Sequence, residues 1–422
     1  MRAPLNRRVF VIGYGAATPL GMHFQTTWEQ AVAGKTGFRR LTRFDIDTPC
    51  DVVGEIPDWD PSSLDFVTEK ELYNWSARFI LLTMSVCKDA LVDAGLEMTP
   101  EVARRTAGLV GSALNGHDAY RQAVRVLAES GPNRISPYLL PNLCGNLPAG
   151  KAGMLLGFQG LSMSPQGACA SGNHAIGLGA RLIRDGDQDF VLAGGVDASL
   201  LPEIIYGFAN MGATIKVKEG DRAYADPSQA SRPFSVDRRG FVLSEGAGVV
   251  LLAAEDVMKD HGISPRAEVL GVGWTSDAFH FTKPNPVTIQ RAMREALGDA
   301  GVAPADLDYI NAHGTSTPRG DSVELACLRE VFGSNLSKIP VSSNKSQLGH
   351  TLGACAAIEA ALTIEGMQQG LVLPTINHVP DPEMADLDVV PNEVRRMPVE
   401  LAMSNAFGFG GTNCCIVFRG VD

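Results

Sequence analysis

The chain has 422 residues, of which 45% are hydrophobic and 20% charged, so it can bury a large core and is too apolar to be disordered. Its net charge of −11 and the lack of any block of Lys and Arg argue against a nucleic-acid-binding protein. No apolar run reaches the roughly 18 residues of a membrane-spanning helix, and the opening MRAPLNRRVFVIG has no signal-peptide core. The eight cysteines lack metal-ligand spacing, and we expect a reduced, cytoplasmic protein without a membrane partner.

Strand-like and helix-like segments alternate along the chain. Residues 9–13 (VFVIG) are predicted to form a buried strand, residues 79–96 an amphipathic helix, and residues 107–113 a second strand. This alternation is typical of an α/β fold with a mainly parallel sheet. Residues 216–239 are rich in charge, Pro and Ser, and we expect a surface loop or lid there.

Four features of the first part of the chain recur in the same order in the second part. They are VIGYG (11–15) and VLGVG (269–273); DALVDAGL (89–96) and EALGDAGV (295–302); strands that lead to a Gly/Ser turn (107–113 and 308–316); and Gly-rich turns that open a helix (167–177 and 349–361). Each match is weak by itself, but the shared order indicates a duplication. We predict one shared core, built from an N-terminal half (1–260) and a C-terminal half (261–422).

Cys169 lies in SPQGACASGNHAIGLGARLI (164–183), between a predicted turn and a helix that ends near Gly186. A cysteine at a helix N-terminus experiences the positive end of the helix dipole, which lowers the thiol pKa from about 8.5. Its small neighbours leave space for a bulky acyl group. A buried cysteine that only packs as a small apolar residue is the alternative at this point.

Two histidines lie at comparable turns. His313 follows a predicted strand in NAHGTSTPRGD (311–321), and His350 precedes the helix in SSNKSQLGHTLGA (342–354). In the duplicated arrangement, His350 takes a helix-start position comparable to that of Cys169, so both helix N-termini would face one central site. A neutral imidazole there can donate a hydrogen bond to a developing oxyanion.

NAFGFGGTN (405–413) places a Gly-Phe-Gly-Gly turn between two strand-like segments. Such a turn can bring backbone N–H groups close to a ligand and can move, although a plain hairpin loop has the same pattern.

Together these motifs, with SRPFSVDRRGFVLSEGAG (231–248), resemble the elongating β-ketoacyl-[acyl-carrier-protein] synthases, most closely the type II class, over nearly the whole chain. The resemblance implies an α/β, thiolase-type fold with two βαβαβαββ halves in five αβαβα layers, and a homodimer. It implies that Cys169 takes the acyl chain from an acyl carrier protein and that His313 and His350 stabilise the enolate formed when malonyl carrier protein loses CO₂. Decarboxylation supplies the driving force, so no metal, nucleotide or flavin is expected.

The same resemblance assigns further residues. The backbone N–H groups of Cys169 and Phe409 would form the oxyanion hole, and the side chain of Phe409 would be the gate. We expect Lys345 and Glu359 to pair and position the loop of His350, although a purely structural ion pair is equally compatible with the sequence. The remaining assignments are Thr315 and Thr317 as contacts of the phosphopantetheine arm and Leu114 as an acyl-pocket residue at the dimer interface.

The chain departs from the family where an acidic carrier protein is usually met by basic residues. The stretch FVTEKELYNWSARF (66–79) keeps Lys70 but has Tyr73 and Asn74 at positions where basic residues are common. A second basic position falls near Gly212. The insertion that follows carries three basic residues that can compensate, namely Lys216, Lys218 and Arg222.

Two other interpretations remain open at this point. The same condensation could serve a specialised, polyketide-like pathway, which would fit the reduced basic cluster near Lys70. A non-catalytic partner subunit, like the chain-length factors, would lack the nucleophile, and the presence of Cys169 with both histidines argues against it.

Overall fold

A computed structural model describes residues 7–57, 59–64, 67–74 and 77–421. Most strands belong to one sheet of ten, which runs from one edge to the other in the order β11 (Val341–Ser342), β10 (Tyr309–Asn311), β14 (Leu401–Gly408), β15 (Thr412–Gly420), β9 (Ala267–Ser276), β1 (Val9–Ala17), β8 (Gly246–Ala254), β6 (Phe190–Asp197), β4 (Thr106–Gly111) and β5 (Ser162–Met163). The smaller sheets are β2 (Phe38–Arg40), β3 (Val52–Gly54) and β7 (Leu243–Ser244), and β12 (Leu371–Val372) with β13 (Arg395–Arg396).

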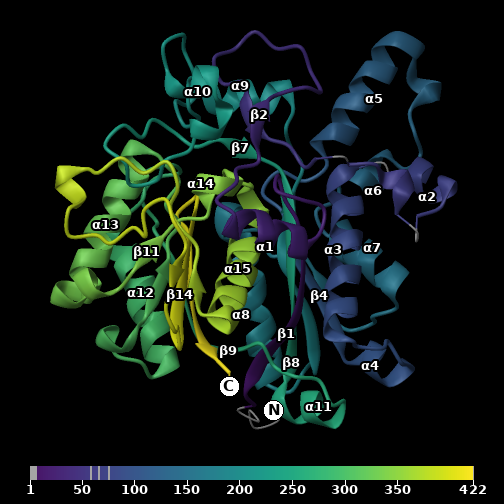
Figure 1. The fold of residues 1–422 in the computed structure, drawn as a ribbon. Helices are drawn as coiled ribbons and strands as arrows, with labels where there is room; N and C mark the ends of the chain where they lie inside the picture. Colours follow the sequence, from purple (N-terminus) through teal and green to yellow (C-terminus); the bar gives the residue numbers. More distant parts are fainter. Residues whose placement is uncertain (1–6, 58, 65–66, 75–76, 422) are drawn as a thin grey trace.

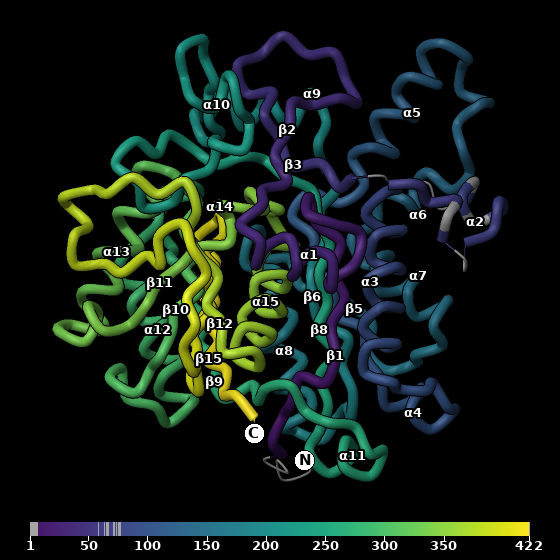
Figure 2. Tube along the Cα trace, viewed as in Figure 1, coloured from purple at the N-terminus to yellow at the C-terminus, as the bar shows by residue number. Residues whose placement is uncertain are grey.

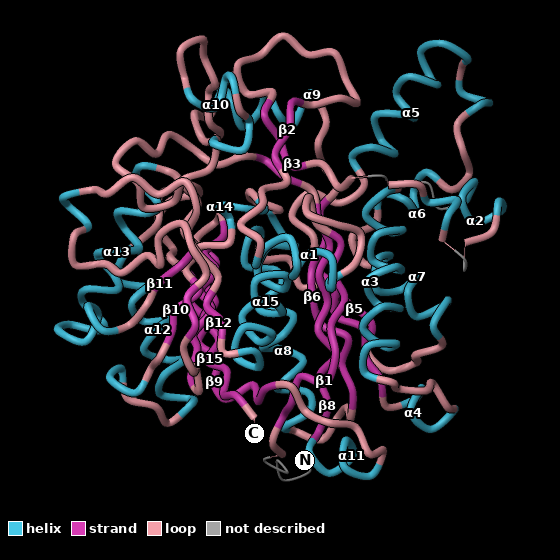
Figure 3. The backbone as a smooth tube through the Cα atoms, viewed as in Figure 1, coloured by secondary structure: helices cyan, strands magenta, loops and turns pink. Residues whose placement is uncertain are grey.

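The strand order is a mirror image about the centre of the large sheet. Read outward from β9, one half runs β9, β15, β14, β10, β11, and read outward from β1 the other runs β1, β8, β6, β4, β5. Within the sheet, the two sets of strands pair between β1 and β9 at two positions, Phe10–Glu268 and Val11–Ala267. Figure 3 shows the two sets of strands separated by helices over most of their length.

Five layers follow from this separation (Figure 1). Helices α8 (Ser171–Arg184) and α15 (Cys355–Gln369) pack between the strand halves, α3 (Arg78–Ala94) and α7 (Leu147–Leu156) cover one outer face, and α12 (Pro286–Ala300) and α13 (Pro318–Phe332) cover the other. Separate apolar clusters fill the central layer and each outer interface. The predicted thiolase-type αβαβα fold is therefore confirmed.

The remaining helices lie around these layers. They are α1 (Phe24–Val32), α2 (Glu69–Asn74), α4 (Pro100–Arg104), α5 (His117–Ser130), α6 (Leu139–Leu143), α9 (Pro202–Asn210), α10 (Arg222–Ala225), α11 (Glu255–Asp260) and α14 (Lys345–Leu348). Figure 2 shows how the chain passes from the first half to the second near α11, close to the N-terminus. Within the described residues, no helix is both long and apolar enough to cross a lipid bilayer.

The repeated sequence features occupy matching places in the two halves. VIGYG and VLGVG lie in β1 and β9, and the helices α3 and α12 end at Gly95 and Gly301, both with φ of 65°. A left-handed residue at this position closes a helix, and glycine adopts it without steric cost. The internal repeat therefore reflects a repeated structural unit.

Two sequence predictions about the fold are wrong. The sheet is mixed and not mainly parallel. In each half of the chain the last strands pair antiparallel, as β14 does with β15 and β6 does with β8. The stretch 216–239 is not one surface loop: it contains α10, and its second half carries the fully buried Phe234, which packs in the core of the C-terminal half. Charge and Pro content did not reveal that single buried aromatic side chain.

Candidate active site

Cys169 lies in a 3₁₀ turn, Ala168–Ala170, that leads directly into α8. The preceding residue, Ala168, has φ of 49°, a left-handed conformation that L-residues rarely adopt and that is often found at functional sites. The thiol is nearly buried, with Cys169 only 6% exposed. Its sulfur lies 3.1 Å from Nε2 of His350, although the two residues are 181 positions apart.

His350 lies between α14 and the next 3₁₀ turn, Leu352–Ala354, which leads into α15. Its backbone is held on both sides, because its N–H donates to the carbonyl of Val242 at 2.8 Å and its carbonyl accepts from Ser244 at 3.0 Å. The structural counterpart of Cys169 is Gly353, since Leu352 repeats the left-handed φ of Ala168, at 51°. The predicted equivalence of His350 with Cys169 is therefore off by three residues, although both lie at the same centre.

His313 follows the end of β10, as predicted. Its ring lies 5.6 Å from the ring of His350, edge to face, at an interplanar angle of 85°. The backbone N–H groups of His313 and Gly314 both donate to the buried carboxylate of Glu324, at 2.9 and 2.7 Å. This carboxylate fixes the turn on which His313 is placed.

Lys345 and Glu359 form the predicted ion pair, with Nζ 2.6 Å from Oε1 and each side chain 1% exposed. Burial alone would lower the pKa of Lys345, but the attraction to Glu359 outweighs it, so the pKa of Lys345 is raised and the ammonium stays charged. Breaking such a buried pair costs about 3–5 kcal/mol because the remaining charge is uncompensated.

The environment of the thiol differs from the sequence expectation. Burial raises the pKa of Cys169 to about 12, although the charge of Lys345 and the backbone N–H groups of Phe409 and Cys169 lower it. The helix N-terminus is present, but desolvation in this closed state is the larger effect. A thiolate therefore needs a proton acceptor in contact, and Nε2 of His350 is within reach.

Both histidines are neutral at physiological pH. Burial, followed by the charge of Lys345, lowers the pKa of His313 and of His350 well below the ordinary value of 6.5. Nδ1 of each ring is buried and has no hydrogen-bond partner among the described residues. Neutral rings of this kind can donate or accept a hydrogen bond without carrying a charge into a dry cavity.

The Gly-Phe-Gly-Gly turn is a hairpin loop between β14 and β15, and it closes over Cys169. The Thr412 hydroxyl donates to the carbonyl of Gly167 at 2.7 Å, and a Cβ on Gly408 would lie only 2.3 Å from the same oxygen. Phe409 itself is 39% exposed. The loop thus joins the nucleophile turn to the surface.

Thr315 and Thr317 lie beside His313, with their hydroxyl oxygens 2.9 Å apart, where the chain enters α13. Leu114 belongs to an apolar cluster with Leu352, Phe241 and Phe208.

The structure adds Phe208 and Phe241, to which no sequence motif assigned a role. The Phe208 ring is 6.4 Å from the Phe409 ring and 5.4 Å from the Phe241 ring, which is itself 5.1 Å from the His350 ring. Phe241 lies in one of the quoted motifs, but nothing in the sequence indicates a ring contact with a histidine 109 positions away along the printed chain.

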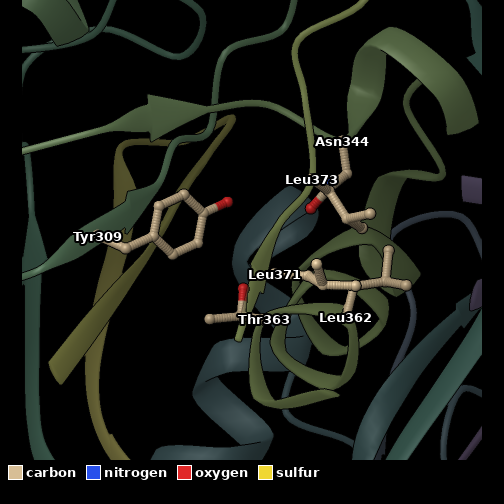
Figure 4. Close-up of a pocket in the computed structure, with 6 residues that line it drawn as sticks. All are labelled: Tyr309, Asn344, Leu362, Thr363, Leu371 and Leu373. Atoms are coloured by element: carbon tan, nitrogen blue, oxygen red, sulfur yellow. The ribbon is translucent and has the colours of Figure 1, made fainter. Parts of the chain in front are cut away.

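A separate small cavity lies behind Asn344, the neighbour of Lys345 (Figure 4). Tyr309, Asn344 and Thr363 supply polar groups, and Leu362, Leu371 and Leu373 complete the lining. Its volume of about 10 Å³ is the space of one water molecule. This cavity is too small for an acyl chain.

The fold and this Cys-His-His centre define a condensing enzyme of the thiolase type. The models of the Beta-ketoacyl synthase N-terminal and C-terminal domains match residues 6–257 and 266–379. The chain therefore belongs to the β-ketoacyl synthase family.

Known proteins of this family resemble the chain over its full length. It is 37% identical to a 3-oxoacyl-[acyl-carrier-protein] synthase 2 of Coxiella burnetii, over 99% of each chain. A β-ketoacyl synthase structure from Burkholderia phymatum matches with a TM-score of 0.90 and 32% identity, over 99% of this chain and 100% of that one. A type II polyketide synthase ketosynthase, solved in complex with its acyl carrier protein, matches with a TM-score of 0.89 and 27% identity over 99% of this chain and 100% of that one.

The lowered pKa values of the histidines predict an acid-tolerant reaction. Because His313 and His350 become protonated only well below pH 6.5, malonyl decarboxylation should stay constant from pH 8 to about pH 6. Replacing the pair by Lys345→Met with Glu359→Gln removes a cation that lowers both pKa values, so the acid limb should move to higher pH. Initial rates of decarboxylation measured against pH report both effects. A wild-type acid limb centred near pH 6.5 would contradict the lowered pKa values of the two histidines.

Proposed function

We propose that this chain extends an acyl chain by two carbons in fatty-acid synthesis, through a decarboxylative Claisen condensation of an acyl thioester with malonyl carrier protein. The observation that carries the proposal is the 3.1 Å contact between the Cys169 sulfur and Nε2 of His350, with the neutral ring of His313 against that of His350. A nucleophile and two uncharged proton donors meet in one buried place.

In the first half-reaction, Cys169 attacks the thioester carbonyl and the pantetheine thiol leaves. The contact with His350 lets Nε2 take the thiol proton, and this offsets the high pKa of the buried Cys169. The N–H groups of Cys169 and Phe409 approach the sulfur and would hold the tetrahedral oxyanion. Thr315 and Thr317 would bind the pantetheine arm, and Phe409 would move to admit it.

In the second half-reaction, malonyl carrier protein loses CO₂ and the resulting carbanion attacks the acyl-Cys169 carbonyl. His313 and His350 would donate hydrogen bonds to the enolate oxygen, which neutral rings can do in a dry site. Burial keeps both rings neutral, and the charge of Lys345 adds to this effect. Lys345, paired with Glu359, would also hold the turn that leads to His350.

The division of roles predicts separable defects. Cys169→Ala should abolish acylation, and His350→Ala should slow it, because Nε2 of His350 takes the thiol proton. His313→Ala should leave acyl transfer largely intact and lower condensation by about a hundredfold to a thousandfold, the usual loss for one oxyanion donor. Intact-protein mass spectrometry reports acylation, and product analysis reports condensation.

The exposed Cys144 offers a matched control, because Cys144→Ala removes a thiol remote from the histidines and should change neither step. Acylation that survives Cys169→Ala, or a His313→Ala variant that blocks acylation and spares decarboxylation, would contradict these roles.

The docking surface for the carrier protein is the next part of the proposal. On α2, Lys70 is exposed but flanked by Glu69, and Asn74 is buried against Asn142; the side chain of Tyr73 lies outside the described part. We infer that an acidic carrier protein docks on the insertion, where Lys216, Lys218 and Arg222 are all exposed.

Backbone contacts tie this insertion to the site. The N–H of Ile215 donates to the carbonyl of Phe241 at 3.0 Å, beside His350. Gly240 donates to Ser316 at 2.9 Å, between the two pantetheine threonines, and its neighbour Arg239 pairs with Asp221 of the insertion at 3.0 Å. These contacts support a docking surface on the insertion, close to Phe241 and Ser316.

Charge reversal on the insertion tests this docking surface. The triple variant Lys216→Glu, Lys218→Glu, Arg222→Glu should raise KM for acyl carrier protein about tenfold, the sum of three modest surface ion pairs, and leave turnover of a small acyl-pantetheine unchanged. Lys259→Glu on α11, at the opposite end of the molecule from α10 in Figure 1, is the control. Equal KM values for the triple variant and the wild type would rule out this surface.

The expected homodimer has support on two elements, helix α5 and strand β5. Helix α5 has no buried residue, and Tyr120, Val124 and Leu127 form an apolar stripe that is 50–56% exposed. Strand β5 is the last strand of the large sheet, with Leu161 and Met163 exposed beside it. We propose that a second copy covers α5 and β5. Helix α5 lies next to Leu114, because the ring of His117 contacts the Leu114 carbonyl.

Charged residues on the stripe should separate the copies. Val124→Glu with Leu127→Glu should give a monomer by light scattering, because burying two carboxylates without partners is unfavourable. Val92→Glu is the control, since Val92 is an isolated, 71% exposed residue on α3. A dimer that persists in the double variant would overturn this placement.

We also retain the division of the chain at residue 260 as a proposal, supported by the mirrored strand order of the two parts. All eight cysteines are free thiols, which supports a reducing compartment such as the cytoplasm.

A further inference from the structure

Asp197, the last residue of β6, is a fully buried carboxylate that the condensation chemistry above does not use. Both of its oxygens are saturated by hydrogen bonds. Oδ1 accepts from the Ser112 hydroxyl and the Leu114 N–H, each at 2.9 Å, and Oδ2 accepts from the N–H of Ala113 at 2.9 Å and of Gly353 at 2.7 Å. One carboxylate therefore joins a turn of the N-terminal half to a turn of the C-terminal half.

The two turns approach too closely for ordinary side chains. A Cβ on Gly353 would lie 2.7 Å from Oδ2 of Asp197 and 2.9 Å from the Ala113 nitrogen. A Cβ on Gly195, in β6, would lie 2.0 Å from the Gly353 carbonyl oxygen. The absence of side chains on Gly353 and Gly195 thus lets the Asp197 carboxylate reach the N–H of Gly353.

Each turn carries a wall of the reaction site. The first turn carries Leu114, and the second carries Leu352, which follows His350 by two residues. Both leucines pack in the same apolar cluster. The first turn also reaches the nucleophile segment, because Gln166 donates to the Asn115 side chain at 3.0 Å. A shift between the turns would therefore move an acyl-chain wall relative to the histidine.

The charge of Asp197 also acts on the nucleophile. Among the described residues no Lys or Arg pairs with Asp197, and its negative charge raises the pKa of the Cys169 thiol, in opposition to Lys345. Burial raises the pKa of Asp197 itself to about 6, and the four donors partly offset this effect, so the group is a carboxylate at pH 7 and above. The neutral rings of His313 and His350 add no charge there.

We propose that Asp197 is a positioning residue for condensation: it locks the Ser112–Leu114 turn against Gly353, and so holds the acyl chain on Cys169 in register with His350. This inference rests on the proposed function for its condensation readout only.

Asp197→Asn is the main test. In either orientation the amide group would place its NH₂ against at least one backbone N–H donor, so the turns should separate, and an error of about 1 Å in placement can lower a rate by about a hundredfold. We expect condensation to fall tenfold to about a hundredfold, with Cys169 acylation reduced much less. Loss of the negative charge should also move the pH midpoint of Cys169 alkylation by iodoacetamide to lower pH, followed by peptide mass spectrometry.

Two further variants separate positioning from general destabilisation. Ser112→Ala removes one donor and keeps the carboxylate, so condensation should fall while the alkylation midpoint stays in place; it also serves if Asp197→Asn does not fold. Asp308→Asn is the matched control, because Asp308 likewise accepts two backbone N–H groups, of Glu400 and Leu401 at 2.9 Å, at a site in the sheet without histidines. It should change neither readout.

The proposal is overturned if Asp197→Asn keeps the wild-type ratio of condensation to acylation, if its alkylation midpoint does not fall, or if Asp308→Asn gives the same losses. With an unfolded Asp197→Asn, a wild-type ratio in Ser112→Ala overturns it. A wild-type protein that never condenses contradicts the proposed function instead, and the alkylation midpoint, which needs no substrate, still tests Asp197.

Discussion

The close contact of α8 with α15 is the constraint on which the site depends. Gly172, in the first turn of α8, packs so tightly that a Cβ there would lie 2.6 Å from the Ala357 nitrogen in α15. Only small residues allow two helices to approach with their backbones almost touching, and both helices lie between the strand halves, shielded from water. Since each helix begins with a 3₁₀ turn, the contact sets the turn of Cys169 against the turn that follows His350.

Burial at that contact explains the electrostatics of the centre. In this buried position the histidines are neutral, the thiol of Cys169 holds its proton, and the nearby cation of Lys345 is compensated by Glu359. A charge is stable in such a buried site only where a compensating partner is in contact with it. This suits a reaction whose enolate forms and reacts at the same place, beside hydrogen-bond donors. Asp197 fits this pattern, because its charge is balanced by four hydrogen-bond donors instead of a cation.

Two surface elements lie near the buried active site. The hairpin loop of Phe409 closes over the nucleophile turn, while the insertion with Lys216, Lys218 and Arg222 lies outside it. The insertion contacts the site through backbone hydrogen bonds to Phe241, and its Ile215 and Val217 pack with Val242, whose carbonyl accepts from the N–H of His350. The proposed docking surface and the residues of the active site therefore belong to different parts of the chain.

The sequence by itself determined the α/β class, the duplication, the identity of Cys169, His313, His350, Lys345, Glu359 and Phe409, and the pairing of Lys345 with Glu359. The α/β class, the duplication and the candidates Cys169, His313 and His350 follow from local spacing and motifs in linear order, whereas the roles of Lys345, Glu359 and Phe409 are what the resemblance to the β-ketoacyl synthases implies. Only the tertiary structure decided the mixed sheet, the burial of Phe234, the rise in the Cys169 pKa, the register in which Gly353 and not His350 matches Cys169, and the roles of Phe208, Phe241 and Asp197. The physical reason is that desolvation and ring or carboxylate contacts depend on which segments, far apart in the chain, become neighbours, and no local pattern encodes that distance.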